Sequence, residues 1–178
     1  MPELPEVETI RRALAPRLVG RTVSGAWGHE SAKFAQAPAA IDARVVAVGR
    51  RGKYLLVDLD RAGEALQLVV HLGMTGVLAM RPSSQPTDGP YVRAWWALDG
   101  GATLVLNDVR RFGRVAVVPA GDYRSLNTLN RLGPEPFSDR FTPQHLRAGV
   151  VATSRAIKTA LLSQRIVAGL GNIYADEA

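Results

Sequence analysis

The first six residues, Met1 to Glu6, place an amine and a carboxylate together at the start of the chain. Removal of Met1 would leave Pro2 with a free secondary amine, and an α-amino group titrates near pH ~8. A modest drop in that pKa gives a neutral nucleophile, which attacks a carbonyl or a sugar C1′ to form an iminium, a Schiff base. The carboxylate of Glu3 is able to shuttle protons beside it. Prolines and glutamates also suit the first turn of a helix, so these residues alone favour a structural role.

Two further stretches combine cations with glycine, as a nucleic-acid partner requires. In Arg50–Lys53 the glycine allows close backbone approach, and the cations suit phosphates. In Asn107–Arg114, arginine side chains could read guanine or an unpaired base edge, and Phe112 could unstack a base step. The alternatives are a charged edge strand for the first stretch and, for the second, a charged turn whose Phe112 is anchored in the core.

Two glycine-containing turns carry weaker signals. The stretch His71–Gly76 has Met74 at a turn tip, where an exposed apolar side chain could wedge between bases. A methionine folded into the core is the commoner case, and a histidine such as His71 is more often structural than catalytic. Gly169–Asn172 precedes a helix, so its backbone N–H groups could hold a phosphate, with Asn172 as cap or contact. A tight turn between two helices is the alternative there.

A helix must carry the terminal amine. Apolar residues recur at helical spacing from Leu4 to Leu18, and Gly20 suits the position after a helix end. We therefore expect a helix from Glu3 to about Val19, with the amine at its start. A helix N-terminus is electropositive, which disfavours the protonated amine and favours a nearby phosphate.

The chain between Arg21 and Pro119 alternates short apolar runs with turn residues, which predicts strands. The predicted strands are Thr22–Trp27, Arg44–Val48, Tyr54–Leu59, Ala65–His71, Val77–Arg81, Arg93–Leu98, Thr103–Asn107 and Arg114–Val118. Strands this short and this regularly spaced indicate an antiparallel sandwich or barrel.

Helical patterns return after Pro119. Thr142 followed by proline predicts the start of a helix that reaches about Ala152. A second helix is expected over Arg155–Val167, because its apolar residues fall on one face, and a third is expected to start near Ile173. The third has too few residues to persist alone, so we expect the chain to be cut within a longer protein.

Composition limits the classes of protein. The 178 residues are 47% hydrophobic, enough for a packed core. A net charge of +6 indicates a polyanionic partner, although many soluble proteins are basic. The absence of cysteine excludes disulfides and thiolate metal sites in this chain. There is no apolar run of membrane-spanning length and no signal-peptide pattern, so we expect a cytoplasmic protein.

Together, the motifs resemble the Fpg/Nei family of DNA glycosylases, on its formamidopyrimidine branch. The matching stretches occur in the family's order and run through the whole chain. They are Met1–Glu8, Arg51–Leu55, His71–Met74, Arg110–Gly113, Leu132–Pro136 and Gly171–Ala178. Each stretch alone is weak evidence, whereas the ordered set is specific.

The resemblance implies an α+β fold. Residues 1–121 would form an N-terminal catalytic antiparallel β-sandwich with flanking helices, and residues 122–178 part of a helix–two-turn–helix domain. It also implies base-excision repair of double-stranded DNA that contains oxidised purines or abasic sites. An oxidised purine, such as 8-oxoguanine or a formamidopyrimidine, is flipped out of the duplex. The terminal proline displaces it, and β,δ-elimination cuts the strand. We expect a monomer associated with the nucleoid.

The resemblance also assigns roles by position. Pro2 would be the Schiff-base nucleophile, Glu3 the proton donor to the sugar oxygen, and Lys53 a proton donor near the lesion phosphates. Met74, Arg110 and Phe112 would fill the gap left by the flipped base, with Arg110 facing the orphaned base. The DNA backbone would be held by His71, Lys158 and Asn172.

This chain departs from the family pattern in three places. Tyr91 stands where a DNA-contacting histidine is expected, and Ser154-Arg155 replaces a lysine. The family continues past Ala178 into further helices and a four-cysteine finger with one structural zinc. We therefore expect these residues to hold no cofactor and the activity of the chain to be impaired by truncation.

Two other functions remain open. One is a catalytically weak module that binds damaged or distorted DNA, which retention of Met1 on the purified chain would favour. The other is an N-terminal-proline tautomerase, which would have no need of the arginine–phenylalanine loop.

Overall fold

The computed structural model describes residues 2–178, so the expected removal of Met1 lies outside the described residues. The helices are α1 (Leu4–Leu18), the 3₁₀ helix η1 (Ala37–Ala40), α2 (Asn127–Asn130), α3 (Pro143–Val151), α4 (Ile157–Leu162) and α5 (Asn172–Glu177). The strands are β1 (Val23–Gly28), β2 (Arg44–Arg51), β3 (Tyr54–Arg61), β4 (Glu64–His71), β5 (Gly76–Pro82), β6 (Val92–Leu98), β7 (Ala102–Asp108) and β8 (Arg114–Pro119).

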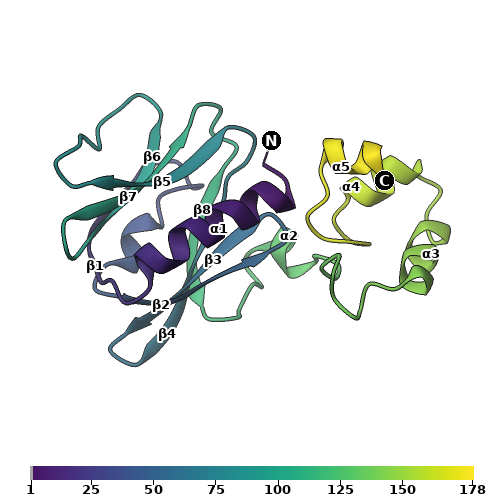
Figure 1. The fold of residues 1–178 in the computed structure, drawn as a ribbon, viewed down its shortest axis with the longest axis horizontal. Helices are drawn as coiled ribbons and strands as arrows, with labels where there is room; N and C mark the ends of the chain where they lie inside the picture. Colours follow the sequence, from purple (N-terminus) through teal and green to yellow (C-terminus); the bar gives the residue numbers. More distant parts are fainter. Residues whose placement is uncertain (1) are drawn as a thin grey trace.

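The strands form two antiparallel four-stranded sheets, ordered β1-β6-β7-β5 and β2-β3-β4-β8 (Figure 1). Inward-facing residues of both sheets meet in one buried cluster, for example Leu55 and Val70 of one sheet with Trp96 and Leu106 of the other. Helix α1 packs against β2 and β5, which are edge strands of the two sheets, and η1 packs against β1 and β8 at the opposite edges. The predicted sandwich is confirmed.

The second face of the β2-β3-β4-β8 sheet is also covered. Leu56 and Val69 point away from the inter-sheet core and pack with Leu126, Leu129 and Leu132 from the segment around α2. Burial on both faces explains the continuous apolar runs in β3 and β4, which an alternating half-buried strand would not show. This segment leads to α3, α4 and α5, which lie beyond one end of the sandwich (Figure 1). The domain boundary at residue 121 stays a prediction.

The predicted helix over Arg155–Val167 is wrong in its second half, because α4 ends at Leu162. Gln164 has φ +62°, in the left-handed region, which an α-helix does not accommodate. The hydroxyl of Ser163 donates to the carbonyl of Ala160 at 2.6 Å and completes the helix end. Ile166 is still buried, so its apolar spacing reflects a packed loop rather than a helix. The helices α2 and η1 were not predicted.

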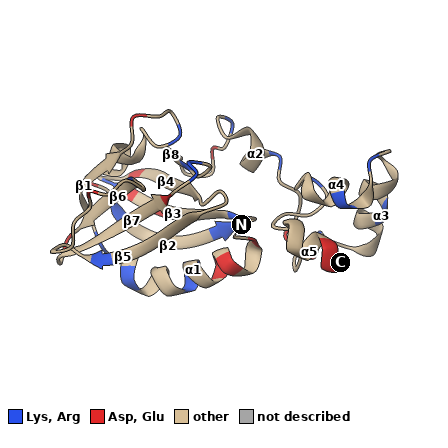
Figure 2. Ribbon diagram, turned by 90° about the horizontal axis from the view of Figure 1, so that it is seen from above, with Lys and Arg blue, Asp and Glu red and all other residues tan. Residues whose placement is uncertain are grey.

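Charged side chains lie on both parts of the molecule (Figure 2). The acidic start of α1 lies next to the basic end of β2, where Arg50 pairs with Glu8 at 3.3 Å. Among residues 2–178, no helix is both long and apolar enough to cross a membrane.

Candidate active site and nucleic-acid interface

The carboxylate of Glu3 is buried, with 2% of the residue exposed, although it lies at the start of the chain. Its Oε2 accepts the N–H groups of Gly171 at 2.5 Å and Tyr174 at 3.3 Å, and its Oε1 accepts that of Ile173 at 2.9 Å. A buried carboxylate needs such partners, because an unpaired one would be strongly destabilising. The start of α1 is thereby fixed to the start of α5.

Two glycines make this close approach possible. Gly169 has φ +93°, and a Cβ there would collide with the side chain of Leu4. A Cβ at Gly171 would collide with the carboxyl group of Glu3. In the turn that could have held a phosphate, the N–H of Gly171 is bound by Glu3 and that of Gly169 by Gln164, whereas the residue Asn172 remains exposed.

Lys53 lies in the tight turn between β2 and β3 and is 8% exposed. Burial lowers the pKa of its ammonium below the ordinary value, while the nearby Glu3 carboxylate acts to raise it. A lysine whose pKa is lowered exchanges protons more readily near neutral pH. Glu3 and Lys53, predicted from separate motifs, therefore share one electrostatic environment.

A polar network fixes the turn that carries Lys53. The N–H of Gly52, at φ +56°, donates to Oε1 of Glu135 at 2.6 Å. Arg50 contacts the carboxylates of both Glu135, at 2.8 Å, and Glu8, at 3.3 Å. Hydrogen bonds from Arg11 first, with Arg12 and Arg50, hold the pKa of Glu8 at about 2. The Leu132–Pro136 motif thus supports the turn that carries Lys53.

Gln164 was missed by the sequence reasoning. Its side chain donates to the carbonyl of Leu170 at 2.5 Å and accepts the N–H of Gly169 at 2.8 Å. Its own carbonyl accepts the N–H of Gly133 at 2.8 Å. The residue therefore shapes the loop that places the turn beneath Glu3. The only sequence signal is a polar residue inside an apolar helical pattern.

His71 lies at the end of β4 with its ring 4.6 Å from that of Tyr54. Its Nδ1 accepts the N–H of Gly73 at 3.2 Å, which leaves the N–H on Nε2. Burial, then the charges of Lys53 and Arg114, lower the pKa of His71 to about 4. A neutral imidazole can still donate one hydrogen bond to a phosphate oxygen.

The lowered pKa of His71 predicts a loss of stability in mild acid. The unfolded histidine binds a proton below pH ~6.5 and the folded one only near pH 4, so this contribution is full above ~6.5 and falls as pH falls. Between pH 7.5 and pH 5 we expect a loss of about 2 kcal/mol, which thermal melting of wild type and His71→Gln would measure.

The variant should lose much less over the same interval. Glu8 and Asp122, whose pKa values are lowered to about 2, lose their contributions only below the chosen interval. Equal acid losses in the two proteins would contradict the assignment.

The loops that carry Met74, Arg110 and Phe112 are joined by buried Asp108. Its carboxylate accepts the hydroxyl of Thr75 at 2.6 Å and the N–H of Gly113 at 2.7 Å. Met74 is 40% exposed and Phe112 47% exposed, so neither is folded into the core. The structure therefore joins the two loops that carry the three side chains which the sequence suggested for opening a helix.

Two further predicted residues lie on separate elements, Tyr91 just before β6 and Lys158 on α4. Tyr91 is 51% exposed, and its carbonyl accepts the N–H of Asp108 at 2.8 Å, at the residue that joins the loops of Met74 and Phe112. Lys158 lies on α4 and forms an ion pair with Asp176 of α5 at 2.6 Å. A phosphate would therefore have to compete with Asp176 for this lysine.

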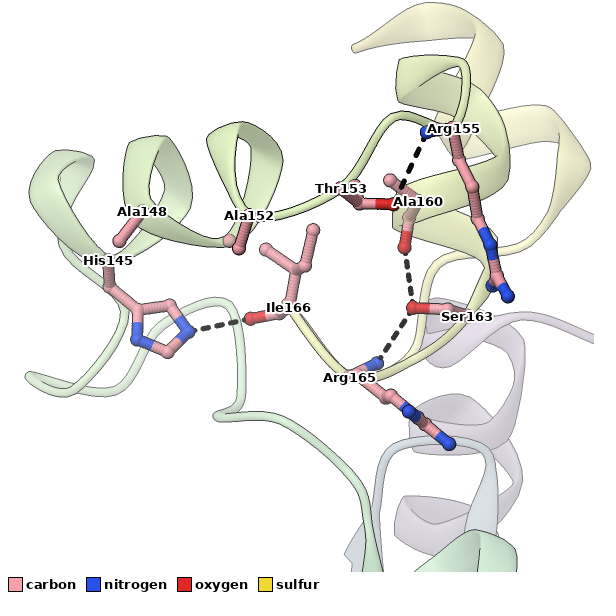
Figure 3. Close-up of a pocket in the computed structure, with 10 residues that line it drawn as sticks. His145, Ala148, Ala152, Thr153, Arg155, Ala160, Ser163, Arg165 and Ile166 are labelled. Atoms are coloured by element: carbon pink, nitrogen blue, oxygen red, sulfur yellow. Dashed lines mark hydrogen bonds between the residues drawn. The ribbon is translucent and has the colours of Figure 1, made fainter.

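A pocket of about 520 Å³ lies between α3 and the loop after α4 (Figure 3). His145 Nε2 lies 2.9 Å from the carbonyl oxygen of Ile166 at one end, and Arg155 and Arg165 line the other. None of the predicted site residues lines this pocket, so its size alone does not mark it as the active site.

The predicted residues Glu3, Lys53, His71 and Phe112 are nevertheless neighbours in turn, each linked to the next by charge or by a backbone contact. Glu3 acts on the pKa of Lys53, and Lys53 acts on that of His71. His71 binds the N–H of Gly73, whose backbone lies against Phe112 and Gly113. A carboxylate, a lysine and the exposed side chains of Met74 and Phe112 therefore follow one path that begins at the start of α1.

Comparisons with known proteins identify the family of this chain. The sequence profile described as the formamidopyrimidine-DNA glycosylase N-terminal domain matches residues 1–115, and the profile of that enzyme's H2TH domain matches residues 132–178. The chain belongs to the formamidopyrimidine-DNA glycosylase family, which confirms the resemblance.

Curated relatives of that name match along the whole chain. Identity is 44% to a Thermus thermophilus protein and 38% to that of Bacillus subtilis. The chain spans 63% of the first relative's length and 65% of the second's.

Solved structures show the same fold. The Thermus thermophilus MutM (Fpg) structure superimposes with a TM-score of 0.88 at 44% identity, covering 99% of this chain and 62% of that one. The Lactococcus lactis Fpg structure with abasic-site DNA gives 0.86 at 29%, covering 98% and 66%.

The zinc that the family resemblance implied has no ligand set in this part of the chain. There is no cysteine, and residues 2–178 contain no group of three His, Asp or Glu side chains placed to hold a metal. We assign no step to a metal here.

Proposed function

We propose that this chain is a DNA glycosylase and abasic-site lyase that removes oxidised purines, such as 8-oxoguanine and formamidopyrimidines, from double-stranded DNA as a monomer. The observation that carries this proposal is that buried Glu3 and the turn of buried Lys53 meet at the Gly169–Gly171 turn, against which Leu4 and Gly52 also pack. Solved relatives bound to abasic-site DNA and to DNA containing carbocyclic 8-oxoguanine support it.

The chemistry starts with a flipped nucleotide. Met74, Arg110 and Phe112 enter the gap, which offsets part of the few kcal/mol that unstacking costs. His71, Tyr91, Lys158 and Asn172 hold the backbone on either side. In this arrangement Arg110 faces the orphaned base and the damaged nucleotide reaches the terminal amine.

Pro2 then attacks C1′, and the bond from C1′ to the base breaks, with the electron pair leaving on the base. The Glu3 carboxylate takes the proton that the Pro2 nitrogen loses and gives it to the sugar ring oxygen, which opens the ring and leaves a cationic iminium between C1′ and Pro2. That cation acidifies the C2′ proton, whose loss expels the 3′ phosphate. Lys53, whose pKa is lowered by burial, exchanges protons with these groups.

The test is borohydride trapping of the 178-residue chain on duplex DNA with an abasic site, in parallel with 8-oxoguanine excision. Reduction of the iminium gives a covalent adduct that resolves on a denaturing gel. We expect trapping to be stronger at low salt, because each phosphate contact contributes a slope of about −0.9 to the salt dependence. Tight binding of abasic DNA without any adduct would instead identify a non-catalytic binding module.

Substitution of Arg110 by alanine is expected to affect recognition rather than folding. Arg110 is exposed, and its Cζ lies 4.7 Å from the centre of the Phe112 ring. The melting temperature should stay within about two degrees, as for ordinary surface substitutions. The preference for cytosine opposite the lesion, measured as the ratio of rates on matched duplexes, should fall. A large loss of stability would show that Arg110 serves the turn itself.

A further inference from the structure

Lys33 contacts the loop of Arg111 and Phe112 from a distant part of the chain. It lies between β1 and η1, and its Nζ donates to the carbonyl of Arg111 at 2.8 Å. The same Nζ lies 5.8 Å from the centre of the Phe112 ring. The backbone of this segment is fixed separately, because the Lys33 carbonyl accepts the N–H of Val115 at 2.7 Å.

The loop needs such support at this point. Arg111 has φ +57°, in the left-handed region. For a residue that has a Cβ, this conformation is unfavourable in free energy, so contacts around it must hold it in place. Phe112 is 47% exposed, so packing alone does not fix its ring. The Lys33 ammonium binds the carbonyl of Arg111. Both this ammonium and the Arg110 guanidinium also lie near the Phe112 ring, within the range of a cation–π contact.

We propose that Lys33 is a positioning residue for the aromatic wedge. It holds Arg111 in its left-handed conformation and keeps the Phe112 ring in the pose that enters the base stack. This inference rests on the proposed function, because it gives Lys33 a part in opening the DNA helix. Lys33 touches neither the reacting sugar nor the leaving base in this scheme, so it should not affect the chemical step.

The experiment separates helix opening from chemistry. A duplex with a tetrahydrofuran abasic analogue and a neighbouring 2-aminopurine reports unstacking by fluorescence, without any reaction. Trapping on a single-stranded abasic oligonucleotide reports the chemistry without a helix to open. Lys33→Met removes the charge at similar length, and Lys33→Arg keeps a cationic donor. Arg124→Met, which removes an exposed cation that pairs with Asp122, is the control for net charge.

We expect Lys33→Met to slow duplex unstacking about fivefold, the order of one lost cation–ring contact and one hydrogen bond. Single-strand trapping should stay within about twofold of wild type. Lys33→Arg should restore most of the unstacking rate, and Arg124→Met should resemble wild type. Melting temperatures check that each variant is folded.

Three results would overturn the inference. Unstacking by Lys33→Met at the wild-type rate would show that the wedge does not depend on Lys33. A salt slope flattened by about one unit relative to Arg124→Met would identify Lys33 as a phosphate contact instead. A wild-type chain that does not unstack the duplex would remove the wedge role altogether. A wild-type chain that unstacks the duplex but gives no trapping would count against the proposed enzyme function. The role of Lys33 would still be supported if Lys33→Met slowed the unstacking.

Discussion

An uncleaved tag that blocks the amine of Pro2 is expected to abolish borohydride trapping on abasic-site DNA. An acylated nitrogen has no free electron pair for C1′ and cannot form an iminium. Trapping should therefore fall by at least about a hundredfold, the order that a missing nucleophile or general acid costs. The measurement is the fraction of labelled abasic duplex converted to covalent adduct by the blocked and the untagged chains.

The matched control carries the same tag at the other end of the chain. It should trap as well as the untagged protein, because the terminal amine remains free. Equal trapping by the N-terminally blocked protein would show that another amine reacts. Lys53 would then be the first candidate, because burial lowers its pKa and Glu3 lies nearby.

The sandwich was predictable because its strands are short, apolar and separated by turn residues. Eight predicted strands overlap β1 to β8. The helix over Arg155–Val167 failed because periodicity reports burial and not backbone conformation. Ile166 is buried in a loop, and the left-handed Gln164 that ends the helix leaves no periodic signal.

The candidate site was only partly visible for a related reason. Residues with chemistry in short motifs, such as Lys53 and Phe112, could be named from sequence, although their roles remain predictions. Residues that act by binding backbone groups of a folded loop could not. Asp108, Gln164 and Lys33 bind carbonyls or amides that only the folded chain brings within reach.

Glu3 both anchors α1 to α5 and, in the proposed mechanism, transfers a proton. The substitution Glu3→Gln is expected to impair both roles. The two carboxylate oxygens accept three N–H groups, one on Oε1 and two on Oε2, and the hydrogen bond from Gly171 is buried. The amide group of glutamine must point its NH₂ at one of these sides, which leaves at least one of the three N–H donors unpaired at the contact between α1 and α5. That costs about 1–3 kcal/mol and should lower the melting temperature by about 2–10 °C.

The reaction should suffer more than the fold. Glutamine has no proton to give to the sugar ring oxygen, so trapping should fall about a hundredfold or more, the usual contribution of a positioned general acid. Glu6→Gln is the matched control in the same helical turn. Its Oε2 accepts only the N–H of Glu3, at 2.9 Å, and glutamine can accept that hydrogen bond equally well.

Two readouts separate the two roles of Glu3. Melting reports the anchor between α1 and α5, because the three amide partners belong to that contact. Trapping at a temperature where the variant is folded reports the proton transfer. A lower melting temperature with normal trapping would leave Glu3 as an anchor alone and would move the acid role to Lys53. Wild-type values in both assays would contradict the role of the carboxylate in the site.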